Sequence, residues 1–201
     1  MRLGILGSGA GSNMAAIAEQ CASGALPAVV TVVLSDVENA GILTRARDMG
    51  LSATFIQPGQ YRTKLDEAAE EQFVRVLKEA EVEWVVLAGF MRLIKADFLK
   101  HFWHKVINIH PSLLPSFPGL EAWQQALDYG VKFTGCTVHI VDHGIDTGPI
   151  LGQETVPVLD ADTPQSLHAR IQEAERRLYP AIIHALAMED IRIQGRRSFQ
   201  K

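Results

Sequence analysis

The composition is that of an ordinary globular protein. The chain has 201 residues, of which 47% are hydrophobic and 21% are charged, and this length is enough for one well-filled core. The formal net charge is -4, so no overall positive field exists to hold a polynucleotide or an acidic lipid surface. We therefore expect one domain, with neither a nucleic acid nor a membrane as partner.

The N-terminal segment and the cysteines point to a protein of the cytoplasm. The apolar stretch in MRLGILGSGAGSN is too short, and too often interrupted by glycine, for a secretory or transmembrane segment. Cys21 and Cys136 lie far apart without metal-ligand spacing, so we expect reduced, structural thiols. No pair of the polar residues discussed below has a typical zinc spacing such as HxxxH, and we expect no metal.

Apolar, β-rich runs alternate with stretches of helical period through the first 90 residues. The expected strands are RLGIL, AVVTVVLS, Ala53–Ile56 and WVVLAGF, and the expected helices are Asn13–Ser23, Gly41–Met49 and Lys64–Ala80. Strands that alternate with helices are typical of a parallel sheet with crossover connections. The pattern predicts a Rossmann-like N-terminal half.

The rhythm changes after Phe90. The segments expected there are a helix at Ala96–Phe102, the strand VINI, the loop HPSLLPSFPG, a helix at Leu120–Tyr129, the strands TGCTVHIV and PILGQETVPV, and a helix at Pro164–Ala187. The two neighbouring strand runs predict an antiparallel edge. We expect an open, mostly parallel, twisted α/β sheet in one catalytic domain, residues 1–188, with a polar, flexible tail, residues 189–201.

A glycine-rich turn, GSGAGSN, joins the first expected strand to the first helix. Backbone N–H groups and the positive end of the helix dipole favour an anion there, and phosphate is the natural guest. The dinucleotide fingerprint would need glycine at Ser12, and the phosphate-loop pattern needs a Gly-Lys pair that is missing. The alternative is a turn without a ligand, capped by Ser12 or Asn13.

The segment VINIHPSLLP places two polar side chains at the end of a hydrophobic strand. Asn108 and His110 are two residues apart, so both side chains emerge from the same face. Ligands of open α/β sheets bind at the carboxyl ends of strands, and Pro111 and Pro115 stiffen the loop that follows. A lone histidine is more often structural, but this setting and a second polar cluster favour a functional role.

The second cluster lies in VHIVDHGIDTGP and contains His139, Asp142, His143 and Asp146. A carboxylate beside a histidine raises the pKa of the imidazole, so Asp146 and His110, if they meet, form a general acid and base. Acyl transfer to an amine needs a proton acceptor, a proton donor and donors for an oxyanion, which Asn108, His110 and Asp146 could supply. The alternatives are a turn-initiating Asp146 and a His139 that only orients its neighbours.

Five segments together resemble the glycinamide ribonucleotide formyltransferases, folate-dependent enzymes of purine biosynthesis. They are GSGAGSN, VVLAGFMRLI, NIHPSLLP followed by PG, TGCTVHIVDHGIDTGPI and ARIQEAERRLYP, and the match extends to about Leu186. NIHPSLLP with a downstream Asp-x-Gly-Pro is specific for the folate-dependent formyltransferase fold. The resemblance implies that 10-formyltetrahydrofolate, as co-substrate, donates its formyl group to the amine of glycinamide ribonucleotide.

The resemblance also implies roles for single residues. Asn108, His110 and Asp146 fall on the catalytic positions: His110 as proton donor, Asp146 raising its pKa and relaying protons, and Asn108 orienting the oxyanion. The substrate phosphate is implied at Gly11, Ser12 and Asn13, and the rest of that substrate at Gln172 and Glu175.

The resemblance implies a folate site as well. Its pterin wall falls on Met91, Arg92, Leu93 and Ile94, whose backbone groups would bind the ring, with Asn108 nearby and Ile145 on the other side. The family's arginine for the folate tail falls in QYRTKLDE, where Arg62 and Lys64 both fit and we choose Lys64. Trp123, with Glu121 and Ala122, departs from the polar or histidine-bearing sequence usual in the family, which affects substrate preference more than reaction type.

Other functions would use some of the same residues. A methionyl-tRNA formyltransferase would be expected to carry a further C-terminal domain, and a formyltetrahydrofolate deformylase an extra N-terminal one. A sugar-nucleotide amine formyltransferase would keep the catalytic residues, but Ser12, Asn13 and Glu175 argue against it. A non-catalytic phosphate or folate sensor would have no need of the catalytic residues, and none is lost. The sequence leaves open whether the chain is a monomer or a homodimer.

Overall fold

The computed structural model describes residues 1–201, which divide into two units, residues 1–107 and 108–201. The expectation of one catalytic domain, residues 1–188, stays a prediction. None of the helices combines the length and the apolar character that crossing a membrane requires.

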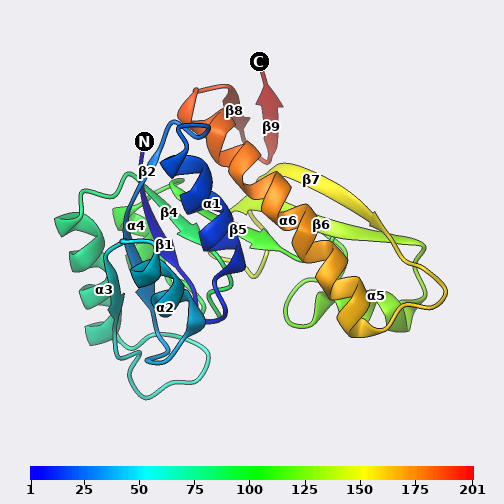
Figure 1. Ribbon diagram of the computed structural model, residues 1–201, viewed down its shortest axis with the longest axis horizontal. Helices are drawn as coiled ribbons and strands as arrows, with labels where there is room; N and C mark the ends of the chain where they lie inside the picture. Colours follow the sequence, from blue (N-terminus) through cyan, green and yellow to red (C-terminus); the bar gives the residue numbers. More distant parts are fainter. The chain divides into compact units, whose positions relative to one another are not determined.

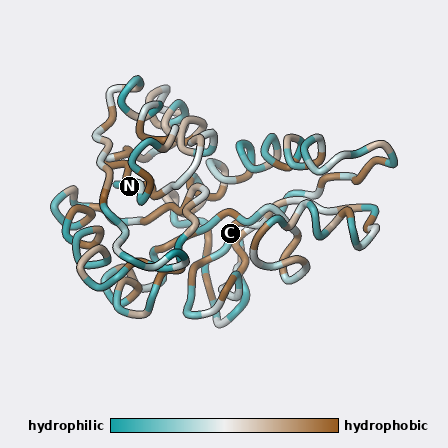
Figure 2. Tube along the Cα trace, turned by 90° about the horizontal axis from the view of Figure 1, so that it is seen from below, coloured by the Kyte–Doolittle hydropathy of each residue, from teal (hydrophilic) through white to brown (hydrophobic).

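Parallel strands form the centre of the first unit (Figure 1). In chain order its elements are β1 (Arg2–Leu6), α1 (Ser12–Ala22), β2 (Val29–Ser35), α2 (Gly41–Asp48), β3 (Ala53–Phe55), α3 (Glu67–Glu79), β4 (Trp84–Leu87) and α4 (Ala96–His101). Leu3, Ile5 and Leu6 of β1 are fully buried, as expected for a strand covered on both faces. Figure 2 shows hydrophobic and hydrophilic residues alternating along the helices, because each helix turns one apolar face inward.

The second unit is built on an antiparallel pair of strands. β5 (Val106–His110) begins in the first unit and ends in the second, followed by α5 (Ala122–Tyr129), β6 (Phe133–Ile140), β7 (Ile150–Pro157), α6 (Pro164–Ala187), β8 (Ile191–Gln194) and β9 (Arg197–Gln200). The strand order of the sheet is β3-β2-β1-β4-β5-β6-β7, and the pairing of β6 with β7 is antiparallel. The expected mostly parallel α/β sheet with an antiparallel C-terminal edge is confirmed.

Helix α6 packs on β6 and β7 and begins at a capping box. The Thr163 side chain accepts from the Ser166 N–H, the Ser166 hydroxyl accepts from the Thr163 N–H, and Pro164 occupies the first turn. The capping box and the proline fix the first residue of α6.

Two segments differ from the expectations. Helix α3 starts at Glu67 rather than Lys64, because the Asp66 carboxylate accepts from the Ala69 N–H at 2.9 Å and caps the helix there. The C-terminal segment, expected as a flexible tail, forms the hairpin β8–β9, and the Ser198 hydroxyl donates to the Ile150 carbonyl at 2.7 Å. Ile191 and Ile193 alternate with polar residues before a glycine, a hairpin pattern that the charged composition of the segment obscures.

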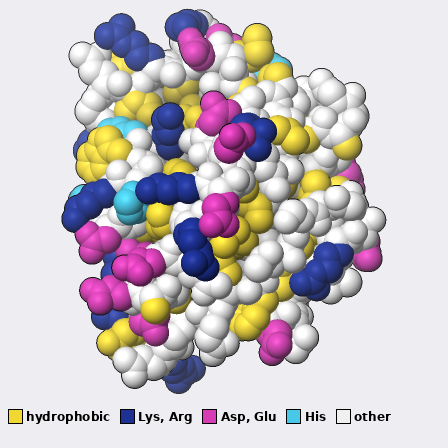
Figure 3. Space-filling view, turned by 90° about the vertical axis from the view of Figure 1, so that its left-hand side faces the viewer, with side chains coloured by type: hydrophobic (Ala, Val, Ile, Leu, Met, Phe, Trp, Pro, Cys, Tyr) yellow, Lys and Arg dark blue, Asp and Glu magenta, His cyan; other side chains and the backbone are white.

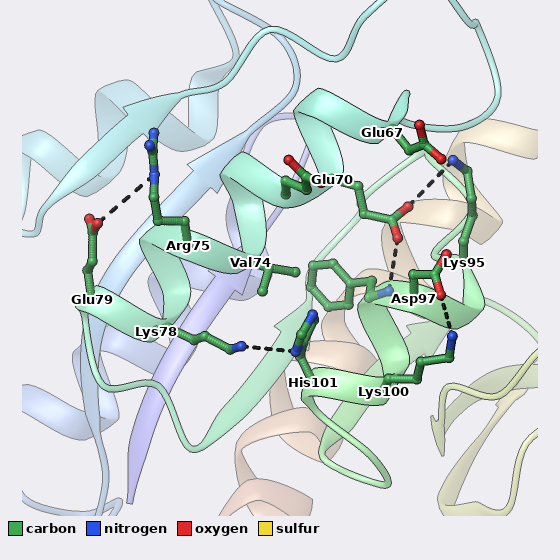
Figure 4. Close-up of a pocket in the computed structure, with 12 residues that line it drawn as sticks. Glu67, Glu70, Val74, Arg75, Lys78, Glu79, Lys95, Asp97, Lys100 and His101 are labelled. Carbon is green, nitrogen blue, oxygen red and sulfur yellow. Dashed lines mark hydrogen bonds and ion pairs between the residues drawn. The ribbon is translucent and has the colours of Figure 1, made fainter.

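A cavity of about 760 Å³ lies between α3 and α4, where acidic and basic side chains converge (Figure 4). Figure 3 shows the two charge types intermixed with hydrophobic side chains over this side of the molecule. The buried Glu70 carboxylate accepts from the Phe98 N–H at 2.9 Å and lies 3.6 Å from Lys95 Nζ. Glu70 thus caps the first turn of α4 from a neighbouring helix. None of the site residues implied by the resemblance lines this cavity.

We expect Glu70→Ala to lower the free energy of unfolding by about 1–3 kcal/mol, because the buried Phe98 N–H loses its acceptor. Urea unfolding followed by circular dichroism measures the change. The matched control is Glu71→Ala, whose side chain is exposed on the same helix and which should stay within about 0.5 kcal/mol of wild type. Equal losses in the two variants would contradict the capping role.

Candidate active site

Four polar side chains of the second unit meet at β5, β6 and the loop that follows β6. His110 Nδ1 lies 3.3 Å from Asp146 Oδ2, and His139 Nε2 lies 3.6 Å from Asp146 Oδ1. Asn108 Nδ2 lies 3.2 Å from His139 Nε2. The structure therefore brings the three expected catalytic residues into one cluster, with His139 linking Asn108 to the carboxylate.

The cluster is largely buried, and burial affects the pKa values of His110 and Asp146. The side chains of His110, His139 and Asp146 are 5%, 3% and 13% exposed. Burial lowers the pKa of His110 below its ordinary 6.5, although the Asp146 charge and the Phe117 carbonyl act in the opposite direction. Asp146 does raise the pKa of His110, as expected. The expected net increase is wrong, because desolvation lowers the pKa by more than Asp146 raises it.

Asp146 is held in its charged form. Burial by itself would raise the pKa of Asp146, but the neighbouring His139 ring, a hydrogen bond from the Gly119 N–H and the charge on His110 bring it below the ordinary value. The Gly119 N–H donates to Asp146 Oδ2 at 2.9 Å. A charged carboxylate at this distance can stabilise a proton taken up by the His110 ring.

The hydrogen bonds of the two imidazoles define their tautomers. His110 Nε2 lies 2.9 Å from the Phe117 carbonyl, which can only accept, so Nε2 carries a proton and Nδ1 faces the carboxylate. In the same way, His139 Nδ1 donates to the Ile140 carbonyl at 2.9 Å. His110 Nδ1 is therefore the position at which a proton is gained and lost next to Asp146.

The loop after β6 is shaped to turn Asp146 back onto the strands. Asp146 adopts a left-handed backbone conformation with φ of 54°. Asp142 Oδ1 accepts from the Gly144 N–H at 3.1 Å and from the Thr147 hydroxyl at 2.6 Å, so Asp142, not Asp146, stabilises the turn. A Cβ atom on Gly148 would lie 1.8 Å from the Ile140 carbonyl oxygen, so only glycine fits there.

A buried threonine that the sequence pattern does not single out holds the loop after His110. The Thr137 hydroxyl donates to the Ser112 carbonyl at 2.7 Å and accepts from the Leu114 N–H and from Gln153 Nε2, both at 3.0 Å. It thereby uses its full hydrogen-bonding capacity. Gln153 Nε2 also donates to the Leu114 carbonyl at 2.9 Å. Only strand alternation could have indicated that Thr137 faces inward.

In the first unit, the glycine-rich turn leads into a helix without a side-chain cap. Gly11 is the N-cap residue of α1 with φ of 80°, and a Cβ atom there would lie 2.7 Å from Ile42 Cα. Ser12 and Asn13 are the first helical residues rather than caps, so the capped-turn alternative is not what forms. The helix start offers backbone N–H groups and a positive dipole end, which suit an anion.

The segment Met91–Ile94 of the first unit is held largely through its backbone. The Met91 N–H donates to the Ser8 hydroxyl at 3.0 Å, and the Leu93 N–H donates to the Thr63 carbonyl at 2.9 Å. The Arg92 side chain is tied down, since its Nε donates to Asp36 Oδ2 at 2.7 Å. The apolar side chains of Met91 and Leu93 remain 60% and 48% exposed.

The remaining expected residues lie as follows. Lys64 Nζ lies 4.5 Å from the centre of the Tyr61 ring and lines a cavity of about 440 Å³ together with Lys95, whereas Arg62 is exposed and does not line it. On α6 of the second unit Gln172 is half-buried and Glu175 is buried, and Ile145 is 56% exposed. Both cysteines are free, and no group of three or more potential metal ligands occurs.

Comparisons with known proteins match nearly the whole chain. Residues 1–183 fit the family model described as formyl transferase. The chain is 38% identical over 185 residues to the phosphoribosylglycinamide formyltransferase of Bacillus subtilis (strain 168), covering 92% of this chain and 94% of that one. It shares a TM-score of 0.95 and 44% identity with the crystal structure of glycinamide ribonucleotide transformylase 1 from Symbiobacterium toebii, covering 100% of this chain and 93% of that one.

A longer relative contains a matching part. The chain is 38% identical over 195 residues to the trifunctional purine biosynthetic protein adenosine-3 of Gallus gallus. The match covers 96% of this chain but only 19% of that protein, so the chain corresponds to a fraction of that relative.

Thr137→Val should lower the free energy of unfolding by about 1–3 kcal/mol, because it leaves the buried Leu114 N–H and the Ser112 carbonyl without their partner. The matched control is Thr134→Val, since Thr134 is also buried on β6 but its hydroxyl has no hydrogen-bond partner. The control should be close to neutral or stabilising. Thermal unfolding compares the two variants, and similar losses would argue against the anchoring role of Thr137.

The pKa of His110, followed by NMR titration of the imidazole, should lie below 6.5 and should fall further in Asp146→Asn, because the variant removes the charge that favours the imidazolium. The unfolded chain then binds more protons than the folded one near pH 6.5. This histidine therefore makes the free energy of unfolding increase with rising pH, and lowers it at pH values below about 6.5. A folded-state pKa above 6.5 would refute the dominance of burial.

Proposed function

The chain belongs to the formyl transferase family, and we propose that it transfers the formyl group of 10-formyltetrahydrofolate to the amine of glycinamide ribonucleotide. The products are formylglycinamide ribonucleotide and tetrahydrofolate, in de novo purine biosynthesis. The observation that carries the proposal is the buried cluster of Asn108, His110 and Asp146, which has the groups that acyl transfer to an amine requires. The names of its full-length relatives support the same acceptor.

His110 and Asp146 manage the proton in the proposed reaction. The substrate amine forms a bond to the formyl carbon while the bond from that carbon to the folate nitrogen breaks, so the amine loses a proton and the departing nitrogen gains one. His110 supplies and takes up this proton, and the neighbouring carboxylate stabilises the charged ring. His139 holds the Asn108 amide in place. The amide then donates a hydrogen bond to the formyl oxygen, where negative charge develops.

The co-substrate would supply the activated formyl group. The pterin ring is assigned to the backbone of Arg92 and Ile94, because the N–H groups of Met91 and Leu93 already donate elsewhere. Ile145, whose side chain is exposed, is likewise assigned to the folate. The anionic tail is assigned to Lys64, since this ammonium lines a cavity that Arg62 does not reach.

The acceptor substrate is assigned to Gly11, Ser12 and Asn13 for its phosphate, and to Gln172 and Glu175 for the remainder. The uncapped start of α1 supports the phosphate assignment. We further propose a cytoplasmic enzyme whose catalytic domain is residues 1–188. Whether it acts as a monomer or a homodimer is decided by analytical ultracentrifugation.

His110→Asn should lower kcat by about 10²–10⁴-fold, since it removes the group that transfers the proton. Binding of a non-reactive folate analogue, measured by calorimetry, should change by less than about threefold, because His110 is not among the residues assigned to the folate. Turnover equal to wild type would remove His110 from the mechanism.

A spectrophotometric assay of folate turnover, run with and without glycinamide ribonucleotide, separates the related functions. Folate turnover should require this acceptor. Turnover without any acceptor would indicate a hydrolase, and turnover only with another amine, such as an aminosugar nucleotide, would indicate a different acceptor pocket.

A further inference from the structure

Two aromatic rings stack where α5 and α6 pack together in the second unit (Figure 1). The indole of Trp123 and the imidazole of His168 have ring centres 3.7 Å apart and planes inclined by only 6°. Both side chains are half-buried. Trp123, the second residue of α5, is also one of the residues at which the sequence departs from the pattern usual in the resembled family. His168 lies on α6, the helix that also carries Gln172 and Glu175.

His168 in turn contacts Gln172, which lies four residues later on the same face of α6. The two Nε2 atoms are 3.3 Å apart. An amide nitrogen donates and does not accept, so the imidazole nitrogen must be the acceptor, which requires a neutral ring with its proton on Nδ1. Burial lowers the pKa of His168 and so favours this neutral form.

The start of α5, which carries the indole, is anchored to the loop that reaches the catalytic carboxylate. Gln125 Nε2 donates to the Pro118 carbonyl at 3.2 Å and to the Leu120 carbonyl at 2.8 Å. Between those two residues, the Gly119 N–H donates to Asp146. The plane of the His168 ring is therefore set by a segment that also holds the catalytic cluster.

We infer that His168, held flat by Trp123, is a positioning residue that decides which end of the Gln172 amide faces the acceptor substrate. An amide that turns its nitrogen to the imidazole turns its oxygen away from it, and that oxygen can only accept. Gln172 thus presents an acceptor and selects a ligand with an N–H or O–H donor at this place, such as a ribose hydroxyl or an amide N–H. The inference rests on the proposed function, in which Gln172 binds glycinamide ribonucleotide.

Steady-state kinetics of the full chain test the inference with His168→Phe, which keeps an aromatic ring on Trp123 but removes the acceptor. KM for glycinamide ribonucleotide should rise about three- to tenfold, the size of one neutral hydrogen bond, while kcat and KM for the folate stay within about twofold. Trp123→Ala should raise the same KM by a smaller factor. In a Gln172→Ala background, His168→Phe should have no further effect, because the residue it orients is gone.

The control is His184→Phe, an exposed position on the same helix, which should match wild type. An unchanged KM in His168→Phe, a factor that persists without Gln172, or a fall in kcat that accompanies a lower Tm would each overturn the positioning role.

A readout that needs no substrate separates this inference from the proposed function. The NMR signals of the Gln172 side-chain amide in the free protein should shift in His168→Phe and not in His184→Phe. If wild type formylates glycinamide ribonucleotide but these signals and KM do not respond, the inference is wrong and the proposed function stands. If the signals respond but wild type does not formylate this acceptor, the proposed function is wrong, and the inference falls with the substrate it assigns.

Discussion

The candidate active site depends on one carboxylate held between two buried imidazoles. Asp146 is largely buried, and its hydrogen bonds and the adjacent rings keep it charged. Its negative charge stabilises an imidazolium at His110. Desolvation lowers the proton affinity of His110 while Asp146 raises it. A group balanced between these two effects releases its proton readily, which suits a residue that must both give and take one.

The rest of the second unit keeps that carboxylate in place. Asp146 occupies a strained left-handed conformation, and Asp142 and Thr147 stabilise the turn that holds it. On the opposite strand end, Thr137 and Gln153 fasten the loop that follows His110. The cluster is therefore preorganised by backbone contacts rather than by its own members alone. Strong restraint of both loops limits how far the acid and the base can drift apart.

In the first unit, the candidate binding segments offer mainly backbone groups. Gly11 starts a helix without a side-chain cap, and the N–H groups of Met91 and Leu93 already donate to other groups of the protein. Backbone donors of this kind lose little conformational entropy on binding. Arg92 illustrates the point, because its long side chain is bound to Asp36 and serves to hold the segment.

The sequence by itself determined the order of helices and strands as far as Ala187, the antiparallel edge and the polar residues expected in the candidate site, because hydrophobic periodicity and short polar motifs are local properties. Only the tertiary structure decided the sign of the net pKa shift of His110, since burial depends on residues remote in sequence. The same holds for the anchoring role of Thr137, for the engaged amides of Met91 and Leu93, and for the stack of Trp123 on His168. Each of these is a contact between distant segments, which no local pattern encodes.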